Sequence, residues 1–210
     1  MNIIVIVIIL VVIIGLIKGI ANDPNRIGKR GEKLIKNILI DSGLGSEERI
    51  LNNIYIPYKD KTSEVDVLLL HETGIYVFES KNYSGWIFGD EDQYKWTQMI
   101  NKNTKKKFYN PIKQNITHIN ALSKFLGIDR TKMKSYIVFS ERCELKKVPE
   151  NNEQYKVLKR NRLSEFIKVD IEKSEDIFTD EEIRNIFEKL KPLTNASEEV
   201  KKKHIENIKE

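Results

Sequence analysis

Two short motifs in the middle of the chain carry side chains that could do chemistry. Glu64-Val65-Asp66 opens one apolar run, and Glu79-Ser80-Lys81 closes the next. Because Glu79 and Lys81 are two residues apart, they project from the same face if the second run is a strand. Carboxylates beside one ammonium group can hold a hard divalent cation, orient water and neutralise charge that develops on a phosphate. The chemistry indicated is phosphodiester hydrolysis.

The two runs predict a β-hairpin with a polar turn at Glu72-Thr73-Gly74. A turn centred between Glu72 and Thr73 sets Asp66 opposite Glu79, whereas a three-residue loop ending at Gly74 shifts the register by one. Facing carboxylates repel, and partial burial raises their pKa unless a cation lies between them. The favoured register therefore predicts a metal site. Taken alone, Glu79-x-Lys81 is better explained as a solvated ion pair, and Asp66 is equally explained as a charge that protects a sheet edge.

Length and composition set the frame for these motifs. The 210 residues suit one domain of ordinary size plus an appendage, and the net charge of +5 is compatible with nucleic acid or an anionic membrane as partner. A mild excess of lysine also occurs in proteins that bind neither. The single cysteine, Cys143, excludes an intrachain disulfide, and His71, His118 and His204 are scattered without zinc-site spacing.

The N-terminus predicts a membrane anchor at residues 1–21 and a polar linker at 22–27. Ile3 to Ile17 is an unbroken apolar run, which reaches the roughly 20 residues of a membrane-crossing helix only if Lys18 extends its ammonium group to the interface. A cleaved signal peptide is the alternative, but the basic start and small-residue cleavage site are missing. Basic residues follow the run, so we expect a single-pass cell-membrane protein whose soluble domain is cytoplasmic.

Hydrophobic periodicity predicts an α/β order of elements across residues 28–192, followed by a polar tail at 193–210. The expected helices begin at Gly28, at Pro111 behind an Asn110 cap, at Leu163, and behind a capping box formed by Thr179 and Glu182. The expected strands are Ile50–Tyr58, Glu64–Leu70, Ile75–Lys81, Ser135–Ser140 and Tyr155–Leu158. The mixed stretch from Trp86 to the basic run at 105–107 has no assigned element.

Taken in order, these segments resemble the nuclease-related domain family, NERD. Gly28-x-x-Gly31-Glu32 opens the first helix, the two acidic motifs follow, and Asn110-Pro111-x-x-Gln114 opens the next helix. The run from Glu79 to Ile87 is the most specific part. The resemblance is close over 28–127 and looser to Pro192. It implies a restriction-endonuclease-like core of the PD-(D/E)xK superfamily, a central mixed sheet flanked by helices. The N-terminal transmembrane helix predicted from the apolar run would precede this α/β core.

The resemblance also implies the roles of five residues. Asp66, Glu79 and Glu32 would hold Mg²⁺ or Mn²⁺, Lys81 would be the catalytic lysine, and Gln114 would help to fix the lysine, water or substrate. From the sequence alone, Glu32 is better explained as a first-turn acid favoured by the helix dipole. Gln114 is as well explained as an exposed polar residue. The implied activity is cleavage of nucleic acid, DNA rather than RNA.

Substrate contacts are predicted where cations and aromatic rings alternate, at Lys105, Lys106, Lys107 and Tyr109. A solvated loop explains the same stretch. Two other functions stay open: a catalytically silent nucleic-acid-binding or scaffold module, and a purely structural membrane-associated protein. Because nucleases of this type that cut both strands often pair, a homodimer is also open.

Overall fold

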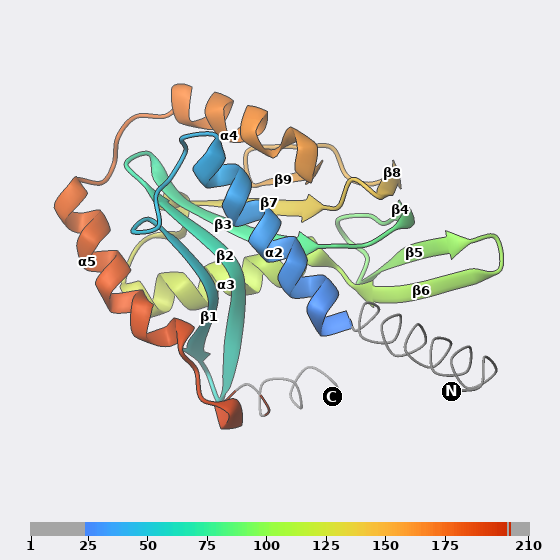
Figure 1. Ribbon diagram of the computed structural model, residues 1–210, viewed down its shortest axis with the longest axis horizontal. Helices are drawn as coiled ribbons and strands as arrows, with labels where there is room; N and C mark the ends of the chain where they lie inside the picture. Colours follow the sequence, from blue (N-terminus) through green and yellow to red (C-terminus); the bar gives the residue numbers. More distant parts are fainter. Residues whose placement is uncertain (1–23, 201, 203–210) are drawn as a thin grey trace, which may run out of the picture.

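The computed structural model describes residues 24–200 and 202 and has two mixed β-sheets flanked by helices (Figure 1). The main sheet has the strand order β1-β2-β3-β7-β9, and the second has the order β6-β5-β4-β8. The strands are β1 (Ile50–Tyr58), β2 (Lys61–His71), β3 (Gly74–Lys81), β4 (Gly85–Phe88), β5 (Lys95–Asn101), β6 (Thr104–Tyr109), β7 (Met133–Phe139), β8 (Cys143–Lys147) and β9 (Tyr155–Lys159). The helices are α2 (Pro24–Asp41), α3 (Pro111–Leu126), α4 (Leu163–Glu172) and α5 (Asp180–Leu190), with 3-10 turns η1 (Arg130–Lys132), η2 (Arg160–Arg162) and η3 (Lys191–Thr194).

The predicted anchor at residues 1–21 lies outside the described residues. Within the described part, no helix is both long and apolar enough to cross a membrane. Helix α2 begins at Pro24 rather than at the expected Gly28, so it takes up most of the stretch predicted as a linker. The tail predicted at 193–210 is described only in part.

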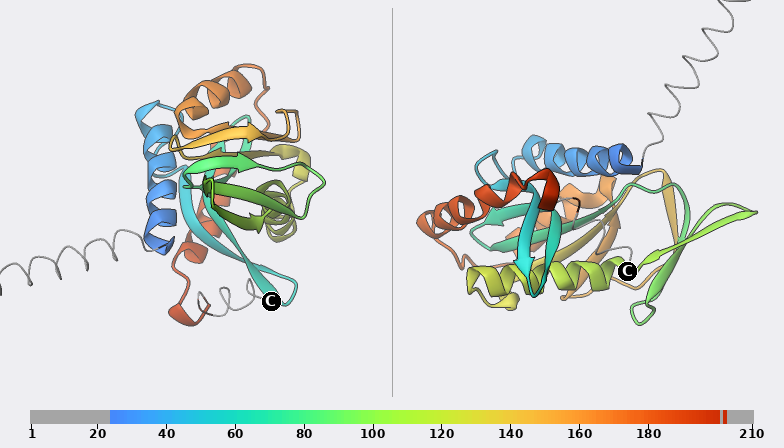
Figure 2. Two further views of the ribbon diagram at one scale, coloured as in Figure 1. Left: turned by 90° about the vertical axis from the view of Figure 1, so that its right-hand side faces the viewer. Right: turned by 90° about the horizontal axis from the view of Figure 1, so that it is seen from below.

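The main sheet is a layer between two pairs of helices (Figure 2). Helices α2 and α4 pack on one face, where Ile35, Leu39 and Ile167 meet apolar side chains of β2, β3 and β7. Helices α3 and α5 pack on the other face, where Leu122 and Leu190 join a second buried cluster. Each face removes a continuous apolar surface from water, which explains why the central strands are apolar throughout rather than alternating.

The hairpin register predicted from the sequence is confirmed. Leu68 pairs with Val77, and Leu70 pairs with Ile75, in an antiparallel ladder. The other edge of β3 pairs in parallel with β7. Strand β3 is therefore central in the sheet, and six of its residues in sequence, from Gly74 to Glu79, are buried.

The predicted helix boundaries at α3 and α5 are also confirmed. The Asn110 side chain accepts a hydrogen bond from the backbone N–H of Ile112 and caps α3. Thr179 and Glu182 form the expected capping box at the start of α5. Such caps satisfy backbone donors that a helix leaves unpaired, and they are local enough to be visible in the sequence.

The second sheet was not predicted. It is built from the stretch after β3 together with β8, and two of its strands, β5 and β6, form a ribbon that extends from the body of the molecule (Figure 1). Gly85 has φ +79°, and a Cβ atom there would lie 2.2 Å from the Met99 carbonyl oxygen, so only glycine fits this turn. Trp96 is fully buried and stacks on Phe139 of β7, which fastens the second sheet to the first.

Candidate active site

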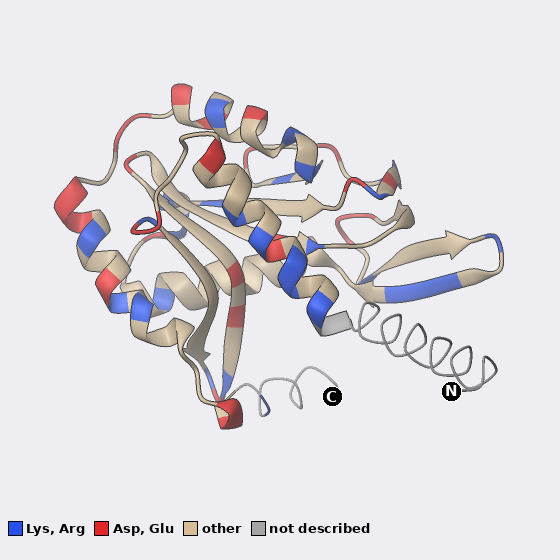
Figure 3. Cartoon of the chain, viewed as in Figure 1, with Lys and Arg blue, Asp and Glu red and all other residues tan. Residues whose placement is uncertain are grey.

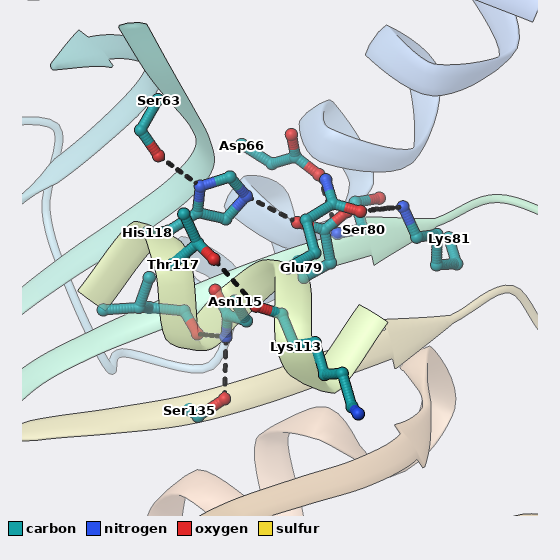
Figure 4. A network of polar contacts seen from close by, with 12 residues as sticks. Ser63, Asp66, Glu79, Ser80, Lys81, Lys113, Asn115, Thr117, His118 and Ser135 are labelled. Carbon is teal, nitrogen blue, oxygen red and sulfur yellow. Dashed lines mark hydrogen bonds and ion pairs between the residues drawn. The ribbon is translucent and has the colours of Figure 1, made fainter. Parts of the chain in front are cut away.

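The predicted acidic motifs meet at one end of the main sheet, where β2 and β3 separate. Their antiparallel ladder extends from His71–Gly74 to Val67–Phe78. Beyond that pair, β3 continues beside β7 as far as the Lys81–Phe139 pair. The resulting gap lies between helix α2 on one face and helix α3 on the other, and charged side chains gather in it (Figure 4).

Asp66 lies where the alternation of β2 breaks, not in the ladder position opposite Glu79 that the sequence predicted. Val65 packs in the cluster under α3 and α5, whereas Val67 packs in the cluster under α2 and α4. Residues two apart on a regular strand share a face, so the conformation of β2 is irregular at Asp66. The Asp66 carboxylate instead accepts a hydrogen bond from the backbone N–H of Ser80 at 2.8 Å. This bond holds it at the gap.

Glu79, Lys81 and Gln114 form one connected group. The Lys81 Nζ donates to Oε1 of Glu79 at 2.6 Å and to Oε1 of Gln114 at 3.1 Å. Only 1% of the Glu79 side chain and 13% of the Lys81 side chain are exposed, so this ion pair is shielded from water. The structure thus brings together a strand Glu-x-Lys motif and the first turn of α3, as the resemblance implied.

His118 completes the group and was missed by the sequence analysis. Its Nε2 lies 3.1 Å from Oε2 of Glu79, and its Nδ1 lies 2.7 Å from the Ser63 hydroxyl (Figure 4). A carboxylate only accepts hydrogen bonds, so Nε2 carries the hydrogen, and a neutral ring then accepts the Ser63 hydroxyl hydrogen at Nδ1. Both oxygens of Glu79 are therefore held, one by Lys81 and one by His118. The spacing could have indicated its role, because His118 follows Gln114 by one helical turn and therefore lies on the same side of the helix.

Helix α3 is fixed to the sheet by a buried amide. The Nδ2 of Asn115 donates to the Val77 carbonyl at 2.9 Å and to the Ser135 hydroxyl at 2.8 Å. These bonds join the helix to both β3 and β7. Because Asn115 lies between Gln114 and His118 in the chain, its bonds fix the position of α3 along β3 and so the position of both side chains in the site.

Glu32 approaches from the opposite helix, α2. A Cβ atom on its neighbour Gly31 would lie 2.7 Å from Oγ of Ser80, so glycine lets α2 come close to the end of β3. The Asn82 side chain adds a second tie by donating to the Ile27 carbonyl at 2.7 Å. These contacts give a structural reason for the Gly31-Glu32 pair. The glycine lets α2 approach β3, and this approach brings the Glu32 carboxylate near the other acidic side chains.

The carboxyl groups of Asp66 and Glu32 are electrostatically unfavourable. Burial, together with the nearby charges of Glu79 and Glu32, raises the pKa of Asp66 well above its usual range. Burial also raises the pKa of Glu32 to about 6, with Glu64 and Glu79 adding to the effect and a hydrogen bond from Asn53 opposing it. Both groups thus lie where negative charge is in excess.

The pKa values of Glu79 and Lys81 shift in the directions of a stable ion pair. Burial alone would raise the pKa of Glu79, but Lys81 and His118 together lower it. Burial alone would lower the pKa of Lys81, but Glu79, with smaller contributions from Tyr83 and Asp66, raises it. At neutral pH the pair is therefore Glu79 carboxylate and Lys81 ammonium.

These charges bear on whether a metal ion fits. Of the three carboxylates, only Glu79 is bonded directly to Lys81, and Asp66 and Glu32 have raised pKa values although the charge of Lys29 opposes the shift of Glu32. A divalent cation would relieve this excess. Among residues 24–200 and 202, no three His, Cys, Asp or Glu side chains converge on one point where a metal could bind. The donors present suit Mg²⁺, which takes one or two carboxylates and keeps several waters.

A family model described as the nuclease-related domain, NERD, matches residues 27–140. The chain belongs to the nuclease-related domain family. An uncharacterized protein of Bacillus anthracis is 34% identical over 189 residues, which cover 88% of this chain and 85% of that protein. No solved structure matches the chain. The family is consistent with the PD-(D/E)xK core expected from the sequence, and all of the site residues described above fall within the matched segment.

The basic residues predicted to contact substrate lie elsewhere in this nuclease-related domain. Lys105, Lys106 and Lys107 are on β6, at the edge of the ribbon, and all three are exposed (Figure 3). Tyr109 ends the same strand, and its ring meets Tyr94 edge-on, with centroids 5.1 Å apart. The structure does not bring these residues into the site. It links them to it through Asn110, where the ribbon passes directly into α3.

Proposed function

We propose that this nuclease-related domain hydrolyses phosphodiester bonds in nucleic acid, DNA rather than RNA, with Mg²⁺ or Mn²⁺ as cofactor. Asp66 and Glu79 would bind the ion, and Glu32 would lie close enough for its carboxylate to be stabilised by the ion's positive charge. The observation that carries the proposal is the excess of acid where β2 and β3 separate: burial and two other carboxylates raise the pKa of Asp66 although Lys81 and the Ser80 N–H oppose the shift. Such a concentration of like charge lowers stability, and strongly shifted pKa values of this kind cluster at functional sites.

When bound, the ion would supply a Lewis acid for the phosphate and a polarised water as nucleophile. The chain's own residues prepare the site for both. Lys81 keeps its proton, since its pKa is raised, and offers a positive charge to a phosphate whose negative charge grows in the transition state. Gln114 and Glu79 hold the Lys81 ammonium group from two sides. His118 fixes the second oxygen of Glu79 and so orients the carboxylate.

The ribbon and the N-terminus extend the proposal to substrate and location. Lys105, Lys106 and Lys107 would contact phosphates of the DNA outside the site, and Tyr109 would stack on a base. Residues 1–21 would anchor the chain in the cell membrane and keep the domain in the cytoplasm. A homodimer would let two sites act on the two strands of a duplex.

A cleavage assay with matched variants tests the proposal. The full-length chain in detergent is incubated with linear, circular and single-stranded DNA and with RNA, in Mg²⁺, Mn²⁺ or EDTA. Asp66→Asn and Lys81→Gln keep the size of each side chain and remove its charge. Cleavage by the wild type that is lost in EDTA and in both variants supports the proposal. No cleavage of any substrate by a folded wild type contradicts it.

One observation favours a second function, a silent nucleic-acid-binding module. Within the described residues the acidic side chains do not converge on one metal position. A domain of that kind would bind DNA equally well with Asp66 or Asn at position 66, and its binding would weaken with salt. The same set of proteins therefore separates the two functions when binding is measured beside cleavage.

A further inference from the structure

A hollow of about 340 Å³ lies beside the proposed active site, between helix α2 and strand β1. Lys29, Lys33 and Lys36 of α2 line one wall, and Glu32 belongs to the same wall. We call this hollow the α2–β1 groove. Its volume is at the lower end of the range for ligand-binding pockets. Glu32 is therefore shared between the groove and the acidic site, on the α2 side of the sheet rather than the α3 side.

The lysine wall follows from helix geometry. Positions 29, 33 and 36 are separated by four and three residues, so their side chains form one row on the helix, and with a rise of 1.5 Å per residue the row spans about 10 Å. Lys36 is ion-paired with Glu47. Lys29 and Lys33 are exposed, and neither forms an ion pair among the described residues. Two cationic heads are thus available in the groove.

The β1 wall of the groove is polar. It is lined by Asn52, Asn53 and Tyr55, and the intervening Ile54 is buried. Asn53 has φ +52°, a left-handed conformation that is rare in a strand. Its side chain bonds to Glu32. The unusual backbone therefore aims an amide toward the site, and backbone outliers of this kind concentrate at functional positions.

We propose that the α2–β1 groove binds the phosphodiester backbone of one nucleic-acid strand and leads it to Glu32 and Asp66. Lys29 and Lys33 would contact successive phosphates, and the amides of Asn52 and Asn53 would donate hydrogen bonds to phosphate or sugar oxygens. The groove is preferred to the ribbon as the strand's entry because it is contiguous with a site residue. The inference rests on the proposed function, since that function names the acidic site as the place to which the strand is led. Binding of the strand in the groove does not itself require cleavage.

An anionic lipid surface is the other polyanion that a basic helix near a membrane could meet. The geometry favours nucleic acid, because the lysines share a hollow with amide and phenol groups rather than lying on an open face with apolar side chains. Figure 3 shows the basic bands of α2 close to the acidic bands of β2.

The test compares two double variants of the full-length chain with the same change in charge. Lys29→Gln/Lys33→Gln removes the groove cations, and Lys124→Gln/Lys168→Gln removes two exposed lysines from α3 and α4. Binding of a labelled DNA oligonucleotide is measured in EDTA, so that no cleavage occurs. We expect the groove variant to bind about tenfold more weakly, with the slope of log K against log salt reduced by about 1.4 for a single strand. The control should stay close to the wild type.

Several outcomes overturn the groove proposal. Equal losses in the two variants would mean a general charge effect, and no loss in either would mean that the groove does not bind the strand. Unchanged DNA binding with weaker binding to anionic vesicles would assign the lysines to a lipid surface. If the groove variant alone loses affinity while the wild type cleaves nothing in Mg²⁺, the groove stands and the nuclease proposal fails. If the wild type cleaves and the groove variant binds normally, the nuclease proposal stands and the groove proposal fails.

Discussion

The Nε2 atom of His118 lies 3.1 Å from Oε2 of Glu79, on the side of that carboxylate away from Lys81. The contact joins residues that are 39 positions apart in the chain, one on β3 and the other on α3. It means that Glu79 has a fixed orientation before any substrate or ion arrives. Second-sphere bonds of this kind tune the group that they hold, so the contact has measurable consequences.

Replacing His118 by Ala should weaken catalysis without removing a reacting group. The buried Glu79 oxygen would lose its partner, which costs about 1–3 kcal/mol in the free energy of unfolding. Cleavage should fall about 10- to 100-fold, as it does when an outer-sphere partner is lost. Denaturant unfolding and initial cleavage rates measure the two effects. Ser63→Ala, which leaves the Glu79 contact intact, should have a smaller effect on rate; an equal loss would contradict the orienting role.

Replacing Asp66 by Asn should stabilise the protein in EDTA while abolishing cleavage. The pKa of this carboxyl group is raised by burial and by neighbouring acids, so its charge is unfavourable in the folded state without a cation. Asn keeps an oxygen for the Ser80 N–H bond and removes the charge. We expect a gain of about 1 kcal/mol at pH 7, measured by urea unfolding. A variant that is less stable than the wild type in EDTA would show that Asp66 is structural.

Mg²⁺ or Mn²⁺ should raise the melting temperature of the wild type and not that of Asp66→Asn. An ion present at a hundred times its dissociation constant adds about 2.7 kcal/mol if it binds only the folded state. For a chain of this size, that gain corresponds to an increase of several degrees. Differential scanning fluorimetry with Ca²⁺ and Na⁺ as controls tests this. Equal shifts in the wild type and the variant would place the ion elsewhere.

The metal-free protein should lose stability as the pH rises through about 6, because of Glu32. Its pKa is raised from an ordinary value of 4.5 to about 6 in the folded protein. The folded state therefore binds its proton more tightly than the unfolded state does, and the resulting stability is complete below pH 4.5 and lost as the pH passes 6. Unfolding in EDTA between pH 4.5 and 7 should be less pH-dependent for Glu32→Gln. An unchanged pH profile would contradict the shared acidic site.

Gly31→Ala should damage the site although Ala normally favours helices. In an exposed helix the change would stabilise by about 1 kcal/mol. Here the new Cβ would lie 2.7 Å from Oγ of Ser80 and would push α2 away from β3. We expect lower stability and slower cleavage, measured as above. Gly28→Ala is the matched control, because its Cβ would meet only the Glu32 carboxylate, at 3.8 Å.

The sequence by itself determined the features that depend on nearby residues. Alternation and turn chemistry gave the hairpin register from Leu68–Val77 to Leu70–Ile75, and capping residues gave the starts of α3 and α5. Motif order also identified the family and the five candidate site residues. The register and the caps are each carried by a few residues within one element or one turn, so they can be read without knowing what packs against them, whereas the family rests on several motifs in order.

The tertiary structure alone decided how those residues meet. The irregularity of β2 at Asp66, the approach of Glu32 through Gly31 and the contact of His118 with Glu79 all depend on elements that are distant in the chain. The second sheet also escaped prediction, because its short strands are stabilised by packing of Trp96 against β7 rather than by a pattern of their own. Long-range packing selects among the conformations that local sequence permits.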